Sequence, residues 1–376
     1  LVAQLVTLAV RTIARWFWRI ALGGVSAVLL LMIAIWVEHL LPIELPRPTG
    51  KLPVGRTSRA VSADLTAWIW YPANHREHVA PYLPDSVRER WTHSRPGVVN
   101  VLTRDLERVR AHGVFEAPFH PDTTRTSVVL FRGGGGGGVL SYTTLFEELA
   151  SHGYVVVAIE GGLGGNPELC DGRPDQADCA TKLINNGIAA MRAVIDRLAT
   201  ISSNDSLFRG HLDMTRLGVF GHSFGGAQAL AFCAADRRCA AGANIDGQLF
   251  GSTVNTAVTV PFLWLLSDHG SARDPVSRRI EVQIQSVYER QPADTRARIM
   301  IRGANHFTFN EDGALLKSGA IRGIMRLVGV LGISGRRQVE ITAYAVRAFF
   351  DSSLRHTGDA QVAIASTAYQ EIVRLP

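Results

Sequence analysis

The chain has 376 residues, of which 47% are hydrophobic and 19% are charged. That length and composition suit one large domain with an extension and a sizeable buried core. The formal net charge is +6, but the arginines that carry it form no continuous basic run and no stripe with aromatic residues. Nucleic acid is therefore not expected as a partner.

An apolar segment near the N-terminus predicts a membrane-spanning helix. Residues 20–37 contain no charged residue, and a helix of that length reaches about 27 Å, close to the thickness of a bilayer's hydrocarbon core. Arg11, Arg15 and Arg19 precede the segment and Glu38 follows it, so the N-terminus is expected in the cytoplasm and the rest of the chain outside it. No small-residue cleavage site follows, which favours an uncleaved anchor over a signal peptide. A buried core helix is the alternative.

These features divide the chain into three predicted parts. Residues 1–41 form a membrane segment with the spanning helix at about 20–37. Residues 42–53 are a proline-bearing linker. Residues 54–376 form a single globular domain.

Four cysteines lie in two close pairs, Cys170 with Cys179 and Cys233 with Cys239. Each pair could close a local disulfide, and two such bridges imply an oxidising compartment. Free thiols in a cytosolic protein are the other possibility. A metal site would need tighter spacing and neighbouring histidines, so no metal is expected.

Taken in chain order, the residue patterns of the domain predict an α/β fold. Residues 56–72 alternate like antiparallel strands, whereas 73–119 lack clear periodicity and could hold helices that cover the active site. Short, continuously apolar runs then alternate with amphipathic segments, the pattern of a mostly parallel sheet with helices on both faces. The predicted strands are 127–131, 154–159, 217–220, 241–246, 261–267 and 298–302, and the predicted helices are 143–153, 187–200, 224–235 and 338–354.

One motif carries most of the chemistry: residues 221–226 read Gly-His-Ser-Phe-Gly-Gly, between a predicted strand and an alanine-rich helix. A nucleophile elbow needs that context, because its serine takes a strained conformation at a tight strand-to-helix turn. Glycines on either side remove the side chains that would collide there. Ser223 is therefore the predicted nucleophile of an α/β-hydrolase fold.

A serine hydroxyl needs a base, and the expected chain order is serine, acid, histidine. The downstream histidines are His269, His306 and His356. His306 follows a predicted strand in a turn from which it can reach the elbow, so it is the predicted base. Two aspartates, Asp246 and Asp268, each end a predicted strand, and spacing does not choose between them.

The oxyanion hole needs two donors. The amide of Phe224, next after the nucleophile, is one candidate. The other is expected in the glycine-rich loop 133–138. That loop lacks the Gly-Lys-Ser/Thr ending of a phosphate loop, so no nucleotide is expected; a merely flexible linker is the alternative.

Several stretches together resemble the plasma-type platelet-activating-factor acetylhydrolases and their bacterial lipase and esterase relatives. They are LPVGRTSRAV (52–61), WYPA (70–73), LFRGGGGGG (130–138), LASHGYVVVAIE (149–160), GHSFGG (221–226), NIDG (244–247) and NHFTF (305–309). The likeness covers roughly Leu52 to Leu354.

The resemblance implies an α/β-hydrolase fold and a reaction without metal or organic cofactor. In that family the acid follows the strand after the nucleophile helix, which favours Asp246 over Asp268. The family's other oxyanion donor aligns with Gly135. The histidine that usually stands two residues earlier is Gly133 here, a departure from the family pattern.

The expected protein is a membrane-anchored serine carboxylic-ester hydrolase whose domain lies outside the cytoplasm, periplasmic or extracellular. The resemblance favours short-acyl lipid esters or other small lipophilic esters as substrates. One alternative is a polyester or cutin-type hydrolase that uses Asp268 and an open groove. Another is a non-catalytic protein that binds a lipid or a partner.

Overall fold

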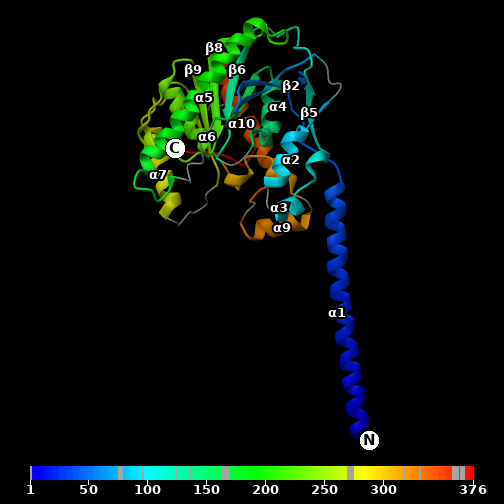
Figure 1. Cartoon of the computed structure of the whole chain (residues 1–376). Coiled ribbons are helices and arrows are strands. Elements are labelled where there is room, and N and C mark those ends of the chain that lie inside the picture. The colour runs from blue at the N-terminus through cyan, green and yellow to red at the C-terminus, as the bar shows by residue number, and fades with distance from the viewer. Residues whose placement is uncertain are drawn as a thin grey trace.

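A large mixed sheet with helices on both faces forms the body of the protein, and one long helix, α1 (Val2–Leu40), projects from it (Figure 1). The computed structural model describes residues 2–74, 79–94, 97–123, 125–135, 138–162, 170–268, 275–316, 319–329, 332–357, 364 and 369–376. The predicted α/β architecture is confirmed.

Within the described residues the sheet has twelve strands, eleven of them in the order β1-β5-β2-β3-β7-β6-β8-β9-β10-β11-β12, with β4 paired to β5. The six strands from β7 to β11 in that order are parallel to one another. The predicted antiparallel strands within 56–72 are the hairpin β2–β3, and β3 runs antiparallel to β7. The bounds are β1 (Ile43–Glu44), β2 (Val54–Ser62), β3 (Leu65–Pro72), β4 (Val79–Pro81), β5 (Val109–Phe115), β6 (Thr126–Arg132), β7 (Val155–Gly161), β8 (Leu212–His222), β9 (Cys239–Ile245), β10 (Phe262–Leu266), β11 (Arg296–Ile301) and β12 (Ile372–Arg374).

Parts of the central strands, such as 128–131 in β6 and 155–159 in β7, are continuously apolar because both faces are buried there. Successive side chains of a strand point to opposite faces. In β6, Val128 and Leu130 accordingly join one core, while Val129 and Phe131 join the other.

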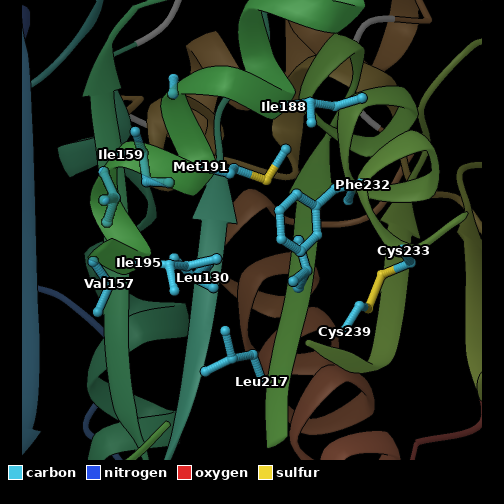
Figure 2. Packing of buried hydrophobic residues seen from close by; sticks show 14 of the residues in the cluster. Leu130, Val157, Ile159, Ile188, Met191, Ile195, Leu217, Phe232, Cys233 and Cys239 are labelled. Carbon is cyan, nitrogen blue, oxygen red and sulfur yellow. A yellow bond between two sulfur atoms is a disulfide. The ribbon is translucent and has the colours of Figure 1, made fainter. Parts of the chain in front are cut away.

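Helices α5, α6 and α7 cover the first core, and α4 and α10 cover the second. Figure 2 shows part of the first core, where side chains of α5 and α6 pack against β6, β7 and β8. The helices are α2 (Asp85–Ser94), α3 (Gly97–Leu102), α4 (Thr143–Ser151), α5 (Gln176–Asn204), α6 (Phe224–Ala235), α7 (Pro275–Glu289), α8 (Asp312–Leu315), α9 (Gly319–Leu327) and α10 (Gly335–Arg355), with short 3₁₀ turns η1 (Leu106–Arg108), η2 (Val139–Tyr142), η4 (Gly251–Asn255) and η5 (His306–Thr308).

Both predicted cysteine pairs form disulfides. Cys170 bonds Cys179, just before and within the start of α5. Cys233 bonds Cys239 and so joins the end of α6 to the first residue of β9 (Figure 2).

The segment expected as a linker lies against the domain instead of acting as a free spacer. Ile43 and Glu44 form β1, which pairs with β5, and the Leu45 side chain is only 1% exposed. Thr49 donates its amide and its hydroxyl to the Glu148 carboxylate, each at 2.7 Å. The segment pairs with the open edge of β5 and buries its leucine in the core. Its proline content reveals neither contact.

Two other boundaries differ from the sequence expectations. The helix expected at about 20–37 is continuous from Val2 to Leu40. Residues 73–119, which lack clear periodicity, hold β4, α2, α3, η1 and the strand β5, which pairs with β1 and β2. Short elements with few periodic residues leave little pattern to read.

Candidate active site

Ser223 stands in a strained turn between β8 and α6. Its backbone angles are φ 56° and ψ −128°, a conformation that non-glycine residues rarely adopt. A Cβ atom added at Gly221 would lie 2.2 Å from the Gly225 carbonyl oxygen, and one at Gly225 would lie 2.2 Å from the Arg132 carbonyl oxygen. Both glycines of the motif are therefore required by close backbone contacts, as expected for a nucleophile elbow.

The structure brings Ser223, His306 and Asp246 into one hydrogen-bonded row. His306 Nε2 lies 3.1 Å from Ser223 Oγ, and His306 Nδ1 lies 2.7 Å from Asp246 Oδ2. Because a carboxylate only accepts hydrogen bonds, Nδ1 carries the proton and Nε2 is free to accept one from the serine hydroxyl. The hydroxyl, the ring and the carboxylate thus have the relative positions that a nucleophile, base and acid require.

The Asp246 carboxylate is held by more than the histidine. Ser267 donates its amide to Oδ1 at 2.8 Å and its hydroxyl to Oδ2 at 2.7 Å. The Asp246 backbone has φ 50°, and the Asn244 side chain fixes this turn by bonding both the amide and the carbonyl of Gly247. Ser267 and Asn244 were not singled out from the sequence, although Asn244 lies in the Asn-Ile-Asp-Gly stretch.

The alternative acid, Asp268, braces the turn that precedes the base. Its Oδ2 accepts the Gly303 amide at 2.7 Å, and its own amide donates to the Ala304 carbonyl at 3.0 Å. His356 lies elsewhere, at the end of α10 beside Arg216. His269 lies outside the described residues.

The glycine-rich loop passes over the elbow. A Cβ added at Gly134 would lie 3.0 Å from the Ser223 Cβ, so the loop backbone is in close contact with the serine. Gly135 is the next residue, and Gly136 and Gly137 lie outside the described residues. Phe224 is the first residue of α6, where the backbone amides have no partner within the helix. Gly134 is thus the loop residue whose contact with the serine is described, one position before the donor expected by alignment.

His222, which belongs to the motif itself, contacts the backbone of the predicted base. Its Nε2 lies 3.1 Å from the His306 carbonyl oxygen and its Nδ1 lies 2.7 Å from the Tyr142 hydroxyl. The carbonyl can only accept, so Nε2 donates to it and Nδ1 accepts from Tyr142. Burial, with the charge of His306, lowers the pKa of His222 to about 3, and the ring is therefore neutral at neutral pH. Burial also raises the pKa of Tyr142 well above its ordinary value, so the hydroxyl keeps the proton that it donates.

Glu311 ties the loop of the base to the neighbouring helix α4. Its carboxylate accepts the Tyr82 hydroxyl at 2.6 Å, and the Thr144 amide and hydroxyl at 2.5 and 2.8 Å. Burial raises the pKa of Glu311 to about 7 despite these donors. The sequence by itself assigns no role to His222, Tyr142 or Glu311, and the histidine within the motif is the only local signal that points to any of them.

Several known proteins are similar to this chain. The family model described as "PETase: PET hydrolase-like" matches residues 138–329, just over half of the chain. The "Probable 1-alkyl-2-acetylglycerophosphocholine esterase" of Arthroderma benhamiae is 24% identical over 284 residues, 69% of either chain. The "Platelet-activating factor acetylhydrolase" of Cavia porcellus is 22% identical over 214 residues, and this chain spans about half of its length, 48%.

Among solved structures, the ferulic acid esterase from Streptomyces cinnamoneus superposes with a TM-score of 0.70 at 25% identity, covering 89% of this chain and 99% of its own. This likeness and the sheet order confirm the α/β-hydrolase fold. The family match covers the elbow, both aspartates and the predicted base. The chain therefore belongs to the PET hydrolase-like family, and it is a serine carboxylic-ester hydrolase.

Proposed function

We propose that Ser223, His306 and Asp246 are the nucleophile, base and acid with which this protein hydrolyses short-acyl lipid esters or other small lipophilic esters. The observation that carries the proposal is the hydrogen-bonded row from Ser223 through His306 to Asp246, with contacts of 3.1 and 2.7 Å, at a serine with positive φ.

In the proposed reaction, His306 Nε2 takes the proton of Ser223 Oγ as that oxygen attacks the ester carbonyl carbon. Asp246 holds the ring orientation and stabilises the imidazolium. The tetrahedral intermediate collapses, and the alcohol leaves with the proton from His306. Water, deprotonated by the same histidine, then attacks the acyl-enzyme and releases the acid.

The oxyanion would be held by backbone amides. The amide of Phe224 at the start of α6 is the first proposed donor, and the alignment-based proposal for the second is Gly135. The close contact of Gly134 with Ser223 supports a donor from this loop. Each such donor typically contributes about 3 kcal/mol to lowering the barrier.

The substrate class rests on the names of the relatives. Two of them are named for acetyl esters of ether phospholipids or platelet-activating factor. The family description and the ferulic acid esterase neighbour favour a second candidate, aromatic esters or a polyester such as poly(ethylene terephthalate). The acetyl-lipid candidate is preferred because a membrane anchor would bring the enzyme to lipophilic substrates.

We also propose that α1 anchors the protein with its domain outside the cytoplasm. The most apolar 18-residue stretch within residues 11–40 has a mean hydropathy of 2.6 and is not buried against the domain. The arginines before the apolar segment support a cytoplasmic N-terminus, and the two disulfides support an oxidising compartment for the domain.

The test is hydrolysis by the full chain in detergent micelles, with p-nitrophenyl acetate, butyrate and decanoate, a short-chain sn-2-acetyl phospholipid, and a polyester film. Wild type is compared with Ser223→Ala, Asp246→Asn and Asp268→Asn. We expect activity to fall with acyl length. Ser223→Ala should lose it by about 10⁴-fold or more, and Asp246→Asn by about 10⁴-fold.

Asp268→Asn should keep most of the activity, because Asp268 braces a turn. Loss of activity in Asp268→Asn with a functional Asp246→Asn would move the acid to the other strand. Preference for the polyester film over the acetyl phospholipid would favour the second substrate class. Activity that survives Ser223→Ala would refute the proposed nucleophile.

A further inference from the structure

Exposed apolar side chains gather in one segment of the domain. Apart from α1 and Leu41, seven large apolar side chains are exposed in the described part of the chain, and four of them lie within 307–328. The four are Phe307, Ile324, Leu327 and Val328, and the Leu327 side chain is 88% exposed. Clustered exposed apolar residues mark an interaction surface, whereas scattered ones do not.

The start of α9 is packed against the domain, whereas its C-terminal end carries exposed apolar side chains. Ile321 points inward and is only 6% exposed, while Ile324, Leu327 and Val328 are exposed. Ile324 and Leu327 are three residues apart on α9 and Val328 directly follows the helix, so these three side chains lie together at its C-terminal end and form what we call its apolar face. Arg322 and Arg326 are interspersed with them. An apolar side accompanied by arginines is typical of helices that lie in the headgroup region of a bilayer, where long cationic side chains reach the phosphates.

A series of side-chain and backbone contacts links the end of α1 to α8, the helix that precedes α9 in the chain. The His39 ring lies 3.1 Å from the Thr103 carbonyl oxygen, and the Glu38 carbonyl and carboxylate both contact Arg104. The Arg104 amide in turn donates to the Leu315 carbonyl at 2.9 Å. Leu315 ends α8, and α9 follows it.

The same contacts indicate where the surface of a bilayer crossed by α1 would lie relative to the domain. The uncharged run of α1 ends at Val37, and contact with the domain begins at Glu38, with no spacer between them. A bilayer that holds α1 must therefore end close to the domain surface at Glu38. Figure 1 shows α9 and α3 on the end of the domain from which α1 leaves.

We propose that the apolar face of α9 and Phe307 lie in the headgroup region of the bilayer that α1 crosses, so that lipophilic esters reach the active site from the membrane. Phe307 is adjacent to the proposed base, and the two rings contact each other edge to face at 5.2 Å between centroids. The occupant of this surface is thus a lipid bilayer. The inference rests on the proposed anchor α1 and goes beyond it.

The test uses the full chain in phosphatidylcholine nanodiscs with one introduced cysteine at a time. All four native cysteines are in disulfides, so a polarity-sensitive thiol dye such as bimane labels only the new one. Leu327→Cys reports on α9. Val282→Cys, on α7, is the matched control because Val282 is also an exposed apolar residue, at 68%. Val28→Cys, in the middle of the apolar run, reports whether α1 is inserted.

We expect spin-labelled lipids to quench the dye at residues 28 and 327 several-fold more than the dye at residue 282. Quenching at 28 with equal quenching at 327 and 282 would refute the inference and leave the anchor standing. Absence of quenching at 28 would refute the anchor and this inference with it. A dye at 327 that is shielded from water but not quenched by lipid would point to a second copy of the chain and would also refute it.

A kinetic comparison tests the delivery of substrate separately. The double variant Ile324→Ser/Leu327→Ser should hydrolyse a short-acyl phospholipid embedded in the nanodisc about tenfold more slowly. Its activity on dissolved p-nitrophenyl acetate should stay at the wild-type level. The control Val282→Ser should change the hydrolysis rate of neither substrate. An equal effect on both substrates, or none on either, would contradict delivery from the bilayer. Wild-type turnover of the dissolved ester keeps this result separate from a failure of the triad.

Discussion

His222 sits inside the Gly-x-Ser-x-Gly turn but contacts the proposed base, and this gives it a role that the motif alone does not assign. It links the hydroxyl of Tyr142 to the backbone of His306. Neutral imidazole suits that position, because one nitrogen must donate while the other accepts. Protonation of His222 would place a cation beside the imidazolium that His306 becomes in the proposed reaction, 4.8 Å away between ring centroids.

Replacing this link should slow the chemical step more than it weakens binding. We predict that His222→Phe lowers kcat by about 10- to 100-fold with little change in KM, because small misplacements of a base are costly. Tyr142→Phe should have the same but smaller effect, since it removes only the distal hydroxyl. Steady-state kinetics with p-nitrophenyl butyrate measure both, and thermal unfolding controls for loss of fold. An unchanged kcat in His222→Phe would show that Asp246 alone suffices to position His306.

Glu147, on α4, has a buried carboxyl group. Its titration should change the free energy of unfolding. Burial raises the pKa of Glu147 to about 7, although the amides of His112 and Gly113 and the charge of Arg56 favour the carboxylate. An acid with a raised pKa binds its proton more tightly in the folded state. The free energy of unfolding that it contributes is therefore highest below about pH 4.5 and falls as pH rises towards 7.

We predict that Glu147→Gln removes this pH dependence. Between pH 5 and pH 8 the wild type should lose on the order of 2 kcal/mol more stability than the variant. Denaturant unfolding at a series of pH values measures the difference, and Glu89→Gln on the exposed side of α2 is the control. Parallel pH profiles for wild type and Glu147→Gln would contradict the prediction.

At the level of elements, residues 43–50 behave as part of the domain. A shortened chain that begins at Leu41 keeps β1, Leu45 and the Thr49–Glu148 hydrogen bonds, whereas one that begins at Lys51 loses them. Burial of one leucine side chain is worth about 1.5–3 kcal/mol. We predict a lower Tm for the chain that starts at Lys51, by several degrees, and a similar loss for Leu45→Ala in the longer chain. Equal melting temperatures would show that this segment contributes nothing to the domain.

For the whole molecule, the two disulfides and α1 together predict a membrane-held protein whose domain lies in an oxidising compartment. Protein taken from its native membrane and denatured should accept no maleimide-polyethylene-glycol tags before reduction and four after it, since all four cysteines are paired. Carbonate washing should leave the chain in the membrane pellet. Four tags without reduction would place the domain in a reducing compartment and reverse the proposed orientation of α1.

Much of the architecture could be predicted from the sequence, because its main strands and helices have strong hydrophobic patterns. Residues 128–131 of β6 and 155–159 of β7 are all apolar since both faces of the sheet are covered there, and α6 is apolar nearly all round since it is buried between the sheet and its neighbours. The short elements within 73–119 and the docked segment 43–50 could not be predicted. Their partners lie far along the chain, on β5, α4 and the loop after His306.

The sequence by itself determined the family, the elbow with Ser223, the chain order of the candidate residues and the apolar length of α1, because each depends on neighbours within a few positions. Only the tertiary structure decided which groups meet. Asp246 and Asp268 end adjacent strands, and the hydrogen bonds of the folded chain direct Asp246 to His306 while Asp268 accepts the Gly303 amide. His222, Tyr142 and Glu311 gain their contacts from residues 80 to 229 positions away. Side-chain contacts over such separations leave no local pattern, since they arise only when the sheet brings distant loops to one edge.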